Sequence, residues 1–382
     1  MKQEMTSRER LWAALDGREP DRVPIWILYP REKLGYYVDV HNLPSYARVM
    51  PHIWERTDWL DRRSIPAPPF YTTAAQVESQ VEVRGGWTIR RSVLHTPLGD
   101  LYAEHRQDRE NASGARTAHY CQDISDLEKI LAIPYEPAEP DLTAFHQAAK
   151  KLGDAGLMMA DLGMPIGVAY GLTHPETFAI WTLTERETLV RFTKIMFERK
   201  YAFLKKALEA GAGSVFFTVG TEFVAPPMCS PAAFDALITP FDAPLFELIH
   251  RYGGKVIVHH HGNTHAILER IAALGADGIQ PIEEPPVGDC TMAQAKERIG
   301  HTANGGVCLI GSVQYDDFER LAPDEMEALV KRQIGDAAHG GGMILAPTAG
   351  PYATHLSERQ QENTIRFIEA GLRWGRYPLQ VT

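Results

Sequence analysis

Three consecutive histidines, His259, His260 and His261, end an apolar run that begins at Lys255, and Gly262-Asn263 follow them. If the run is a buried strand, its side chains alternate between two faces, so His259 and His261 share a face about 6.6 Å apart along the chain. Two imidazoles at that spacing suit one divalent metal ion, and imidazole is a common zinc ligand. The alternative is a pair of hydrogen-bonded histidines at a substrate cleft without metal, because buried imidazoles need partners.

These histidines need a scaffold, which the C-terminal two thirds of the chain supplies as short apolar runs alternating with helix-length patterns. Near-continuous apolar strands separated by helices indicate a parallel sheet covered on both sides. So many repeats favour an α/β fold of the (β/α)8 TIM-barrel type, with 24–28 as its first strand. The further strands are expected at 157–160, 214–219, 255–258, 278–282, 308–311 and 343–346, and the helices at 185–210, 231–252 with a break near Pro240 and Pro244, 264–274, 291–299 and 324–339.

Residues 73–120 interrupt this alternation. Charged and apolar residues alternate from Val81 to Val93 around Gly85-Gly86, which is a hairpin signature. We interpret 73–120 as a β-rich excursion, either a lid or an oligomer contact, within a single barrel domain that spans 1–382.

Composition excludes several classes of protein. The 382 residues are 44% hydrophobic, enough for a large core, and the formal charge of -10 argues against nucleic acid or an anionic membrane as partner. The first residues indicate a helix capped by Thr6 or Ser7 rather than a signal peptide, and no run approaches the ~20 apolar residues that span a bilayer. We therefore expect a soluble, cytoplasmic protein. Four scattered cysteines without CxxC spacing predict neither a disulfide framework nor a zinc ribbon.

Chemistry in such a barrel lies where the strands end. Glu222 follows the expected strand at 214–219, and with His259 and His261 it would form a His2Glu metal set with an open position for substrate. Glu283 and Glu284 follow the expected strand at 278–282. A carboxylate before Pro-Pro can equally cap a helix or pair with a surface lysine, which is the alternative to a role in the site. We predict the catalytic residues to be Glu222, Glu283 and Gln314, the cofactor-binding residues Asp161, Asn263 and Tyr315, and the metal ligands His259, His261 and Glu222, with His355 as a further candidate ligand.

An ordered set of motifs extends over nearly the whole chain. It comprises Arg8-Glu9-Arg10, the segment 17–24, Thr96-Pro97-Leu98-Gly99, Ser230-Pro231 with Phe234 and Pro240, the turn 259–263, Gly340-Gly341-Gly342 and Glu362-Asn363. Together these motifs resemble the uroporphyrinogen decarboxylase superfamily, which also contains cobalamin-dependent methyltransferases. The resemblance implies the same barrel.

Departures from the family pattern separate its branches. True uroporphyrinogen decarboxylases carry Arg-Gln-Ala-Gly-Arg after the first strand, and this chain has Tyr29-Pro30-Arg31-Glu32-Lys33 there. One arginine is a poor match for a polyanionic porphyrinogen, because bidentate arginine pairs organise such binding. Porphyrinogen decarboxylation is therefore not expected.

The branch that serves thiol acceptors holds zinc with a His-x-Cys pair and a later cysteine. Here His261 and Thr348-Ala349-Gly350 stand at the cysteine positions, so both sulfurs are missing. A metal held by nitrogen and oxygen is a stronger Lewis acid than one held by thiolates. Our hypothesis is a methyltransferase that moves a methyl group from a small O-methylated substrate to a corrinoid (cobalamin), free or on a corrinoid protein, with zinc as Lewis acid.

Two other functions are compatible with the same residues. One is a metal-assisted decarboxylase or lyase of a small carboxylated substrate that needs no corrinoid. The other is a protein that binds a corrinoid or tetrapyrrole without catalysis. A homodimer is expected, because barrels of this superfamily often pair.

Overall fold

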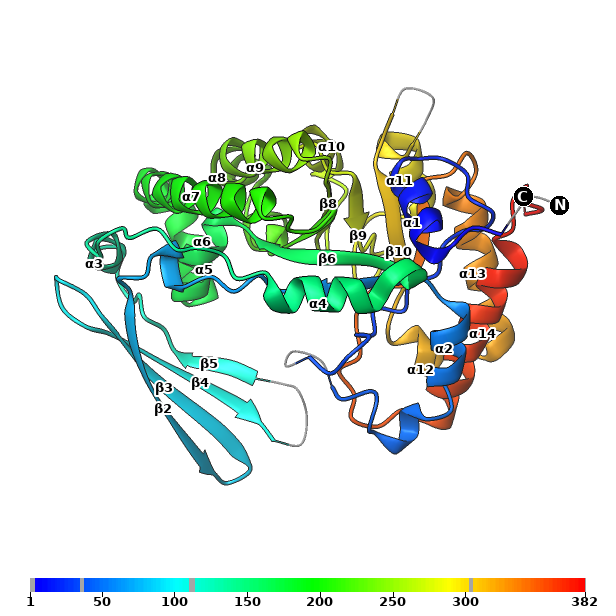
Figure 1. The fold of residues 1–382 in the computed structure, drawn as a ribbon, viewed down its shortest axis with the longest axis horizontal. Coiled ribbons are helices and arrows are strands. Elements are labelled where there is room, and N and C mark those ends of the chain that lie inside the picture. The colour runs from blue at the N-terminus through cyan, green and yellow to red at the C-terminus, as the bar shows by residue number, and fades with distance from the viewer. Residues whose placement is uncertain (1–3, 35–37, 110–113, 302–304, 382) are drawn as a thin grey trace.

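The computed structural model describes residues 4–34, 38–109, 114–301 and 305–381. Its centre is a curled parallel sheet with the strand order β1-β6-β7-β8-β9-β10-β11, surrounded by helices (Figure 1). The predicted α/β barrel is confirmed. The strands are β1 Trp59–Arg63, β6 Gly156–Gly163, β7 Val215–Val219, β8 Lys255–His259, β9 Gly278–Gln280, β10 Cys308–Val313 and β11 Met343–Pro347.

The chain around Ile25 lies between β11 and β1 and closes the barrel. Ile25 pairs in parallel with Leu345, and the Asp58 N–H donates to the Ile25 carbonyl at 2.7 Å. The predicted first strand at 24–28 thus has the expected place, but its ladder is reduced to one bridge. Pro24 has no N–H to donate, and Leu28 adopts a φ of 61°, which ends the extended backbone.

The helices that were predicted around the barrel are present, with changes at their ends. The helix at 185–210 is α7, and the helix at 231–252 breaks at Ile238, before Pro240, into α8 and α9. The helix at 264–274 begins only at Leu268. The helices are α1 Ser7–Leu15, α2 Met50–Arg56, α3 Asp126–Leu131, α4 Thr143–Leu152, α5 Pro165–Leu172, α6 Pro175–Thr184, α7 Arg186–Glu209, α8 Pro231–Leu237, α9 Thr239–Arg251, α10 Leu268–Ala273, α11 Met292–Ile299, α12 Asp317–Arg320, α13 Pro323–Ala337 and α14 Glu358–Trp374, and short 3-10 turns are η1 Pro44–Tyr46, η2 Pro69–Tyr71, η3 Gly153–Ala155 and η4 Thr221–Val224.

Two apolar clusters form the core. One lies between the sheet and its helices. The other fills the barrel and is closed at the N-terminal ends of the strands by Leu11, Ala14 and Leu15 of α1. Thr6 caps α1 as predicted, in a capping box with Glu9. All four cysteines are buried and free, as the absence of CxxC spacing indicated.

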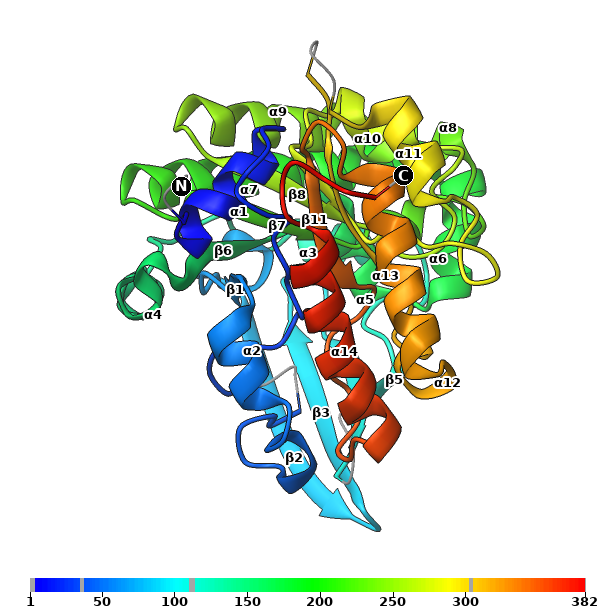
Figure 2. The same ribbon diagram turned by 90° about the vertical axis from the view of Figure 1, so that its right-hand side faces the viewer.

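A second, antiparallel sheet stands beside the barrel. Its strand order is β2-β3-β4-β5, and Figures 1 and 2 show β2 and β3 extending beyond the barrel. The strands are β2 Gln76–Arg84, β3 Trp87–His95, β4 Leu101–Asp108 and β5 Gly114–Ala118. The expected hairpin is β2-β3, joined by Gly85 and Gly86 with φ of 56° and 83°. Residues 110–113 of the expected excursion lie outside the described residues.

No helix in the described part of the chain combines the length and the apolar character needed to cross a membrane.

Candidate functional site

The histidine cluster lies at the C-terminal end of β8, as predicted. His259 and His261 share one face, with ring centroids 4.6 Å apart and ring planes at 88°. Because Ile257 lies in the cluster that fills the barrel, alternation directs His259 toward the barrel interior. His260 points the other way, is fully buried, and pairs through Nδ1 with the Thr221 hydroxyl at 2.9 Å. The expected division of the three histidines is therefore confirmed.

His259 is held in one tautomer by Gln280, its neighbour in the parallel register of β8 and β9. The Gln280 amide nitrogen donates to the Thr348 carbonyl at 3.2 Å and lies 3.4 Å from the Pro347 carbonyl, which fixes its orientation. The amide oxygen must then accept from His259 Nδ1, at 2.5 Å. Burial and the neighbouring His261 lower the pKa of His259 to about 3. His259 is therefore neutral, with the lone pair on Nε2.

His261 is held by Glu283. Its Nδ1 lies 3.2 Å from Glu283 Oε1, while Oε2 accepts the Gly262 N–H at 2.6 Å. Burial disfavours the charged ring, but the hydrogen bond and charge of Glu283 outweigh it, so the pKa of His261 is raised. Both histidines thus use Nδ1 for an oxygen partner, the arrangement by which proteins orient imidazole ligands of a metal.

Glu222 lies in η4, directly after β7. Its Oε2 atom is buried and has no hydrogen-bond partner among the described residues. Burial raises the pKa of this carboxyl, and the neighbouring His261 lowers it in part. The next residue, Phe223, stacks on Tyr170 of α5 with ring centroids 3.7 Å apart. Glu222 is therefore an unsatisfied oxygen donor within electrostatic reach of the histidines.

The donors at this mouth have the chemistry of a zinc site, since two imidazole nitrogens and one orphaned carboxylate oxygen are ligands that zinc accepts. As the side chains stand, no three His, Cys, Asp or Glu residues within the described ranges are grouped closely enough to hold a metal ion. The two histidines have their Nδ1 atoms facing oxygen partners, and Glu222 is not grouped with them closely enough for ligation.

Asp161 lies near the C-terminal end of β6 and forms an ion pair with Arg62 of β1. Its other oxygen accepts from the Ser64 hydroxyl at 2.6 Å. The Arg62 guanidinium lies 5.0 Å from the centre of the Phe217 ring, and the Phe217 ring is 5.1 Å from His259. Arg62 was missed by sequence reasoning because β1 was not recognised as a strand. An arginine two residues after the apolar pair Trp59-Leu60 was the available signal.

Gln314 and Tyr315, which follow β10, meet at Thr348. The Thr348 hydroxyl donates to Gln314 Oε1 at 3.2 Å and lies 3.3 Å from the Tyr315 N–H. The Gln314 amide nitrogen is buried without a partner among the described residues. The Tyr315 ring packs on Tyr352, and burial raises the pKa of its hydroxyl to about 12. Through Thr348 these residues connect to Gln280 and hence to His259.

The remaining candidates are more peripheral. Asn263 is half-buried in the turn that follows Gly262, and His355 is exposed in the loop after β11. Glu284 accepts two hydrogen bonds from Arg332, at 3.0 and 2.7 Å. Of the two adjacent glutamates, Glu283 contacts His261. Glu284 makes an ion pair, the alternative considered from the sequence, with an arginine in place of a lysine.

Arg31 belongs to the segment Tyr29-Pro30-Arg31-Glu32-Lys33. Its guanidinium lies 4.4 Å from the centre of the Trp54 ring and 5.2 Å from that of Trp59. Cation–π stacking of this kind holds the guanidinium against two indoles.

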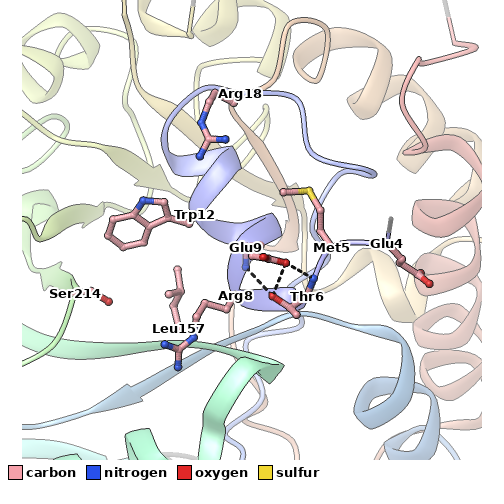
Figure 3. Close-up of a pocket in the computed structure, with 9 residues that line it drawn as sticks. All are labelled: Glu4, Met5, Thr6, Arg8, Glu9, Trp12, Arg18, Leu157 and Ser214. Atoms are coloured by element: carbon pink, nitrogen blue, oxygen red, sulfur yellow. Dashed lines mark hydrogen bonds between the residues drawn. The ribbon is translucent and has the colours of Figure 1, made fainter. Parts of the chain in front are cut away.

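A cavity of about 770 Å³ lies at the other end of the barrel, between α1 and the starts of β6 and β7 (Figure 3). Its two arginines are engaged: Arg8 donates to the Gly153 carbonyl at 2.8 Å, and Arg18 pairs with Asp16 at 3.0 Å. It is lined by Glu4, Met5, Thr6, Arg8, Glu9, Trp12, Arg18, Leu157 and Ser214, none of them predicted for the site.

Comparison with known proteins places these features in context. A family model described as uroporphyrinogen decarboxylase (URO-D) matches residues 108–370. Two curated relatives, both named methylcobamide:CoM methyltransferase MtaA, come from Methanosarcina barkeri, one of them from strain Fusaro / DSM 804. Each is 23% identical over 355 residues, which cover 91% of this chain and 93% of the relative. A solved methyltransferase from Methanosarcina mazei has a TM-score of 0.61 at 19% identity and covers 97% of this chain and 99% of its own.

Proposed function

Because the chain belongs to the uroporphyrinogen decarboxylase family, we propose that it is a corrinoid-dependent methyltransferase that removes a methyl group from a small O-methylated substrate. The observation that carries the proposal is the pair His259 and His261, each with Nδ1 held by an oxygen and Nε2 left for a ligand. The names of the two curated relatives support methyl transfer that involves a corrinoid. The stacked position of Arg31 argues against binding of a porphyrinogen.

We propose that Nε2 of His259 and His261, together with the orphaned oxygen of Glu222, hold a zinc ion. When bound there, zinc would supply Lewis acidity toward the oxygen that carries the methyl group. A nitrogen and oxygen set suits that task better than thiolates, which transfer charge to the metal. The unpartnered carboxylate oxygen in a buried setting supports Glu222 as the third ligand, because such an atom is costly unless something binds it.

The protein's own residues fix the geometry around this position. Gln280 and Glu283 hold the two rings, and the carbonyls of Pro347 and Thr348 hold Gln280 in turn. Rigid support of this kind reduces the reorganisation needed when charge develops on the leaving oxygen. In the transfer itself the methyl C–O bond would break with its electron pair left on oxygen, and a reduced corrinoid, when bound, would supply the pair for the new bond to carbon.

We assign the other candidate residues to substrate and corrinoid contacts at the same mouth. Gln314 has an unpartnered buried amide nitrogen that can donate to a substrate oxygen. Asp161 lies near the end of β6, and Asn263 and Tyr315 follow β8 and β10, so together they extend around the C-terminal edge of the barrel, where a corrinoid, free or on a carrier protein, would approach. Asp161 would act mainly by holding Arg62 beside Phe217.

The proposal is tested with the full chain. Zinc is measured in the purified protein, and the absorbance of a reduced corrinoid is followed after addition of an O-methyl, N-methyl or S-methyl donor, here 2-methoxyphenol, trimethylamine and dimethyl sulfide. We expect stoichiometric zinc and methylation of the corrinoid only with the O-methyl donor. The double variant His259→Ala plus His261→Ala should lose zinc binding and corrinoid methylation. The control His265→Ala, which replaces an exposed histidine of the same loop, should keep zinc binding and corrinoid methylation.

Three results would contradict the proposal. Absence of zinc binding would contradict the proposed zinc site. Full demethylation by the double histidine variant would contradict the proposed role of the two histidines. Release of carbon dioxide from a small carboxylated substrate without any corrinoid would make the protein a decarboxylase.

A further inference from the structure

The small sheet has an open edge at β2. All nine residues from Gln76 to Arg84 are exposed, and Val77, Val81 and Val83 expose 41%, 55% and 58% of their surface. The strand contains no proline or glycine, and its register with β3 is unbroken from Gln76 to Arg84. Soluble proteins usually protect such edges with prolines, bulges or short strands, because an open edge pairs readily with another strand. Figure 2 shows the end of this hairpin extending away from the barrel.

The turn of the hairpin determines which backbone groups face outward. Gly85 and Gly86 both have positive φ, which is the pattern of a two-residue type I′ turn. In such a hairpin the residues flanking the turn, Arg84 and Trp87, form a hydrogen-bonded pair. Every second residue of β2 from Arg84 backward therefore bonds to β3. The alternate residues Val77, Ser79, Val81 and Val83 direct their N–H and C=O groups to the open edge.

We propose that β2 pairs antiparallel with β2 of a second copy of this chain, across a twofold axis at Val81. The two small sheets then form one continuous sheet. In this register Val81 is opposite Val81 and Ser79 is opposite Val83, and both are pairs whose backbone groups face the edge. In the same register Glu78 lies opposite Arg84, and Gln80 lies opposite Glu82.

Charge selects this register. A twofold axis one residue earlier, at Gln80, would place Glu78 opposite Glu82 on both sides, and like charges directly opposite are unfavourable. With the axis at Val81, Arg84, which has no ion-pair partner among the described residues, meets Glu78 of the other copy twice. Glu78 itself makes only a 3.5 Å contact with His95. Glu82 remains paired with Arg91 of its own chain, at 2.8 Å.

Sedimentation equilibrium of the full chain tests the assembly. We expect a particle of twice the 42.7 kDa chain mass. Val81→Lys places two ammonium groups opposite each other at the axis and should raise the dimer dissociation constant at least ~10-fold. Val81 is exposed, so the variant should fold, which circular dichroism checks. Val287→Lys is the matched control, because Val287 is equally exposed at 55% and lies outside the small sheet.

Charge reversal tests the register. Glu78→Lys and Arg84→Glu should each weaken the dimer, since each places like charges opposite one another twice. Combining the two substitutions restores opposite charges and should restore the dimer. A dimer formed through another surface would be indifferent to all three changes, and that result would overturn the proposal.

Cross-linking locates the axis. Opposed Cα atoms of an antiparallel hydrogen-bonded pair are ~5.5 Å apart, within the range of a disulfide. Val81→Cys should therefore form a covalent dimer on oxidation, and the four buried native cysteines do not compete. Val77→Cys should not, because residue 77 lies opposite Gly85 in this register. A chain that stays monomeric at every concentration, or equal cross-linking at both positions, would refute the pairing.

Discussion

Gln280 offers the sharpest test of the proposed site, through the substitution Gln280→Leu. The side chain is fully buried and joins His259 to the Pro347 and Thr348 carbonyls. Leucine is similar in size but has no polar atom. The substitution therefore removes the acceptor that fixes the His259 tautomer, and it leaves the His259 Nδ1–H group and the Thr348 carbonyl without their partner.

The magnitude follows from those unpaired groups. Each buried polar group without a partner costs ~1–3 kcal/mol, and the substitution leaves at least two such groups. Burial of the apolar leucine side chain offsets part of this cost, so the free energy of unfolding should fall by ~2–4 kcal/mol. Loss of the residue that orients a ligating histidine typically weakens metal binding ~10–100-fold. On the proposed function, the dissociation constant for zinc should rise by that factor.

The assay is a zinc titration against a competing chromophoric chelator, with urea unfolding measured in parallel. Gln333→Leu is the matched control. Gln333 is a buried glutamine of α13 whose amide donates to the Ser312 hydroxyl at 3.1 Å and accepts the Ser312 N–H at 3.3 Å. It should lose similar stability and keep its zinc affinity.

Equal zinc affinity in Gln280→Leu and the wild type would refute the reasoning about the tautomer. Equal losses of affinity in Gln280→Leu and Gln333→Leu would show that general destabilisation, rather than orientation of His259, governs zinc binding.

Three further predictions concern stability. Burial raises the pKa of Asp242 from 3.8 to about 7, so the folded chain holds a proton that the unfolded chain releases between these values. The free energy of unfolding should therefore fall as pH rises through that window, by up to ~4 kcal/mol, and Asp242→Asn should flatten this slope in urea unfolding at pH 5 and pH 8. Thr6→Ala removes the α1 capping box, in which Thr6 accepts the Glu9 N–H at 3.2 Å, and should cost ~1 kcal/mol in the same unfolding assay. Gly156→Ala would place a Cβ 1.9 Å from the Trp59 carbonyl oxygen, between β1 and β6, and should cost ~3 kcal/mol or more, whereas Gly171→Ala, with open space around its Cβ, should keep its melting temperature.

The sequence predicted the barrel because most of its strands are apolar runs, and it failed where a strand carries charges. β1 reads Trp-Leu-Asp-Arg-Arg, and apart from the ion pair between Asp61 and Arg63 at 3.0 Å, its charged residues take partners distant in sequence. Asp61 is buried and accepts the Arg31 N–H at 3.1 Å, and Arg62 pairs with Asp161. Only seven strands were expected from the sequence, whereas a (β/α)8 barrel needs eight. An eighth strand between residues 28 and 157 could therefore have been inferred from the sequence.

The sequence indicated which candidate residues follow the strands, but not which contacts they make. Alternation along a strand was enough to separate His260 from His259 and His261. The partnership of His259 with Gln280 depends on the register of two parallel strands that are distant in sequence. The engagement of Glu284 by Arg332 depends on a helix that begins dozens of residues later. Neither has a local signal in the chain.

The contacts of Glu283 give a physical reason why position 261 suits an imidazole rather than a thiolate. This carboxylate is 3% exposed, and its two oxygens accept from the Gly262 N–H and contact His261 Nδ1. A cysteine thiolate at position 261 would remove the ring N–H and place a second negative charge beside a buried carboxylate, which is unfavourable at such low exposure. Glu283 therefore suits an imidazole at this position and disfavours the thiolate of the thiol-directed branch. The carboxylate that follows β9 thus matches an imidazole at position 261.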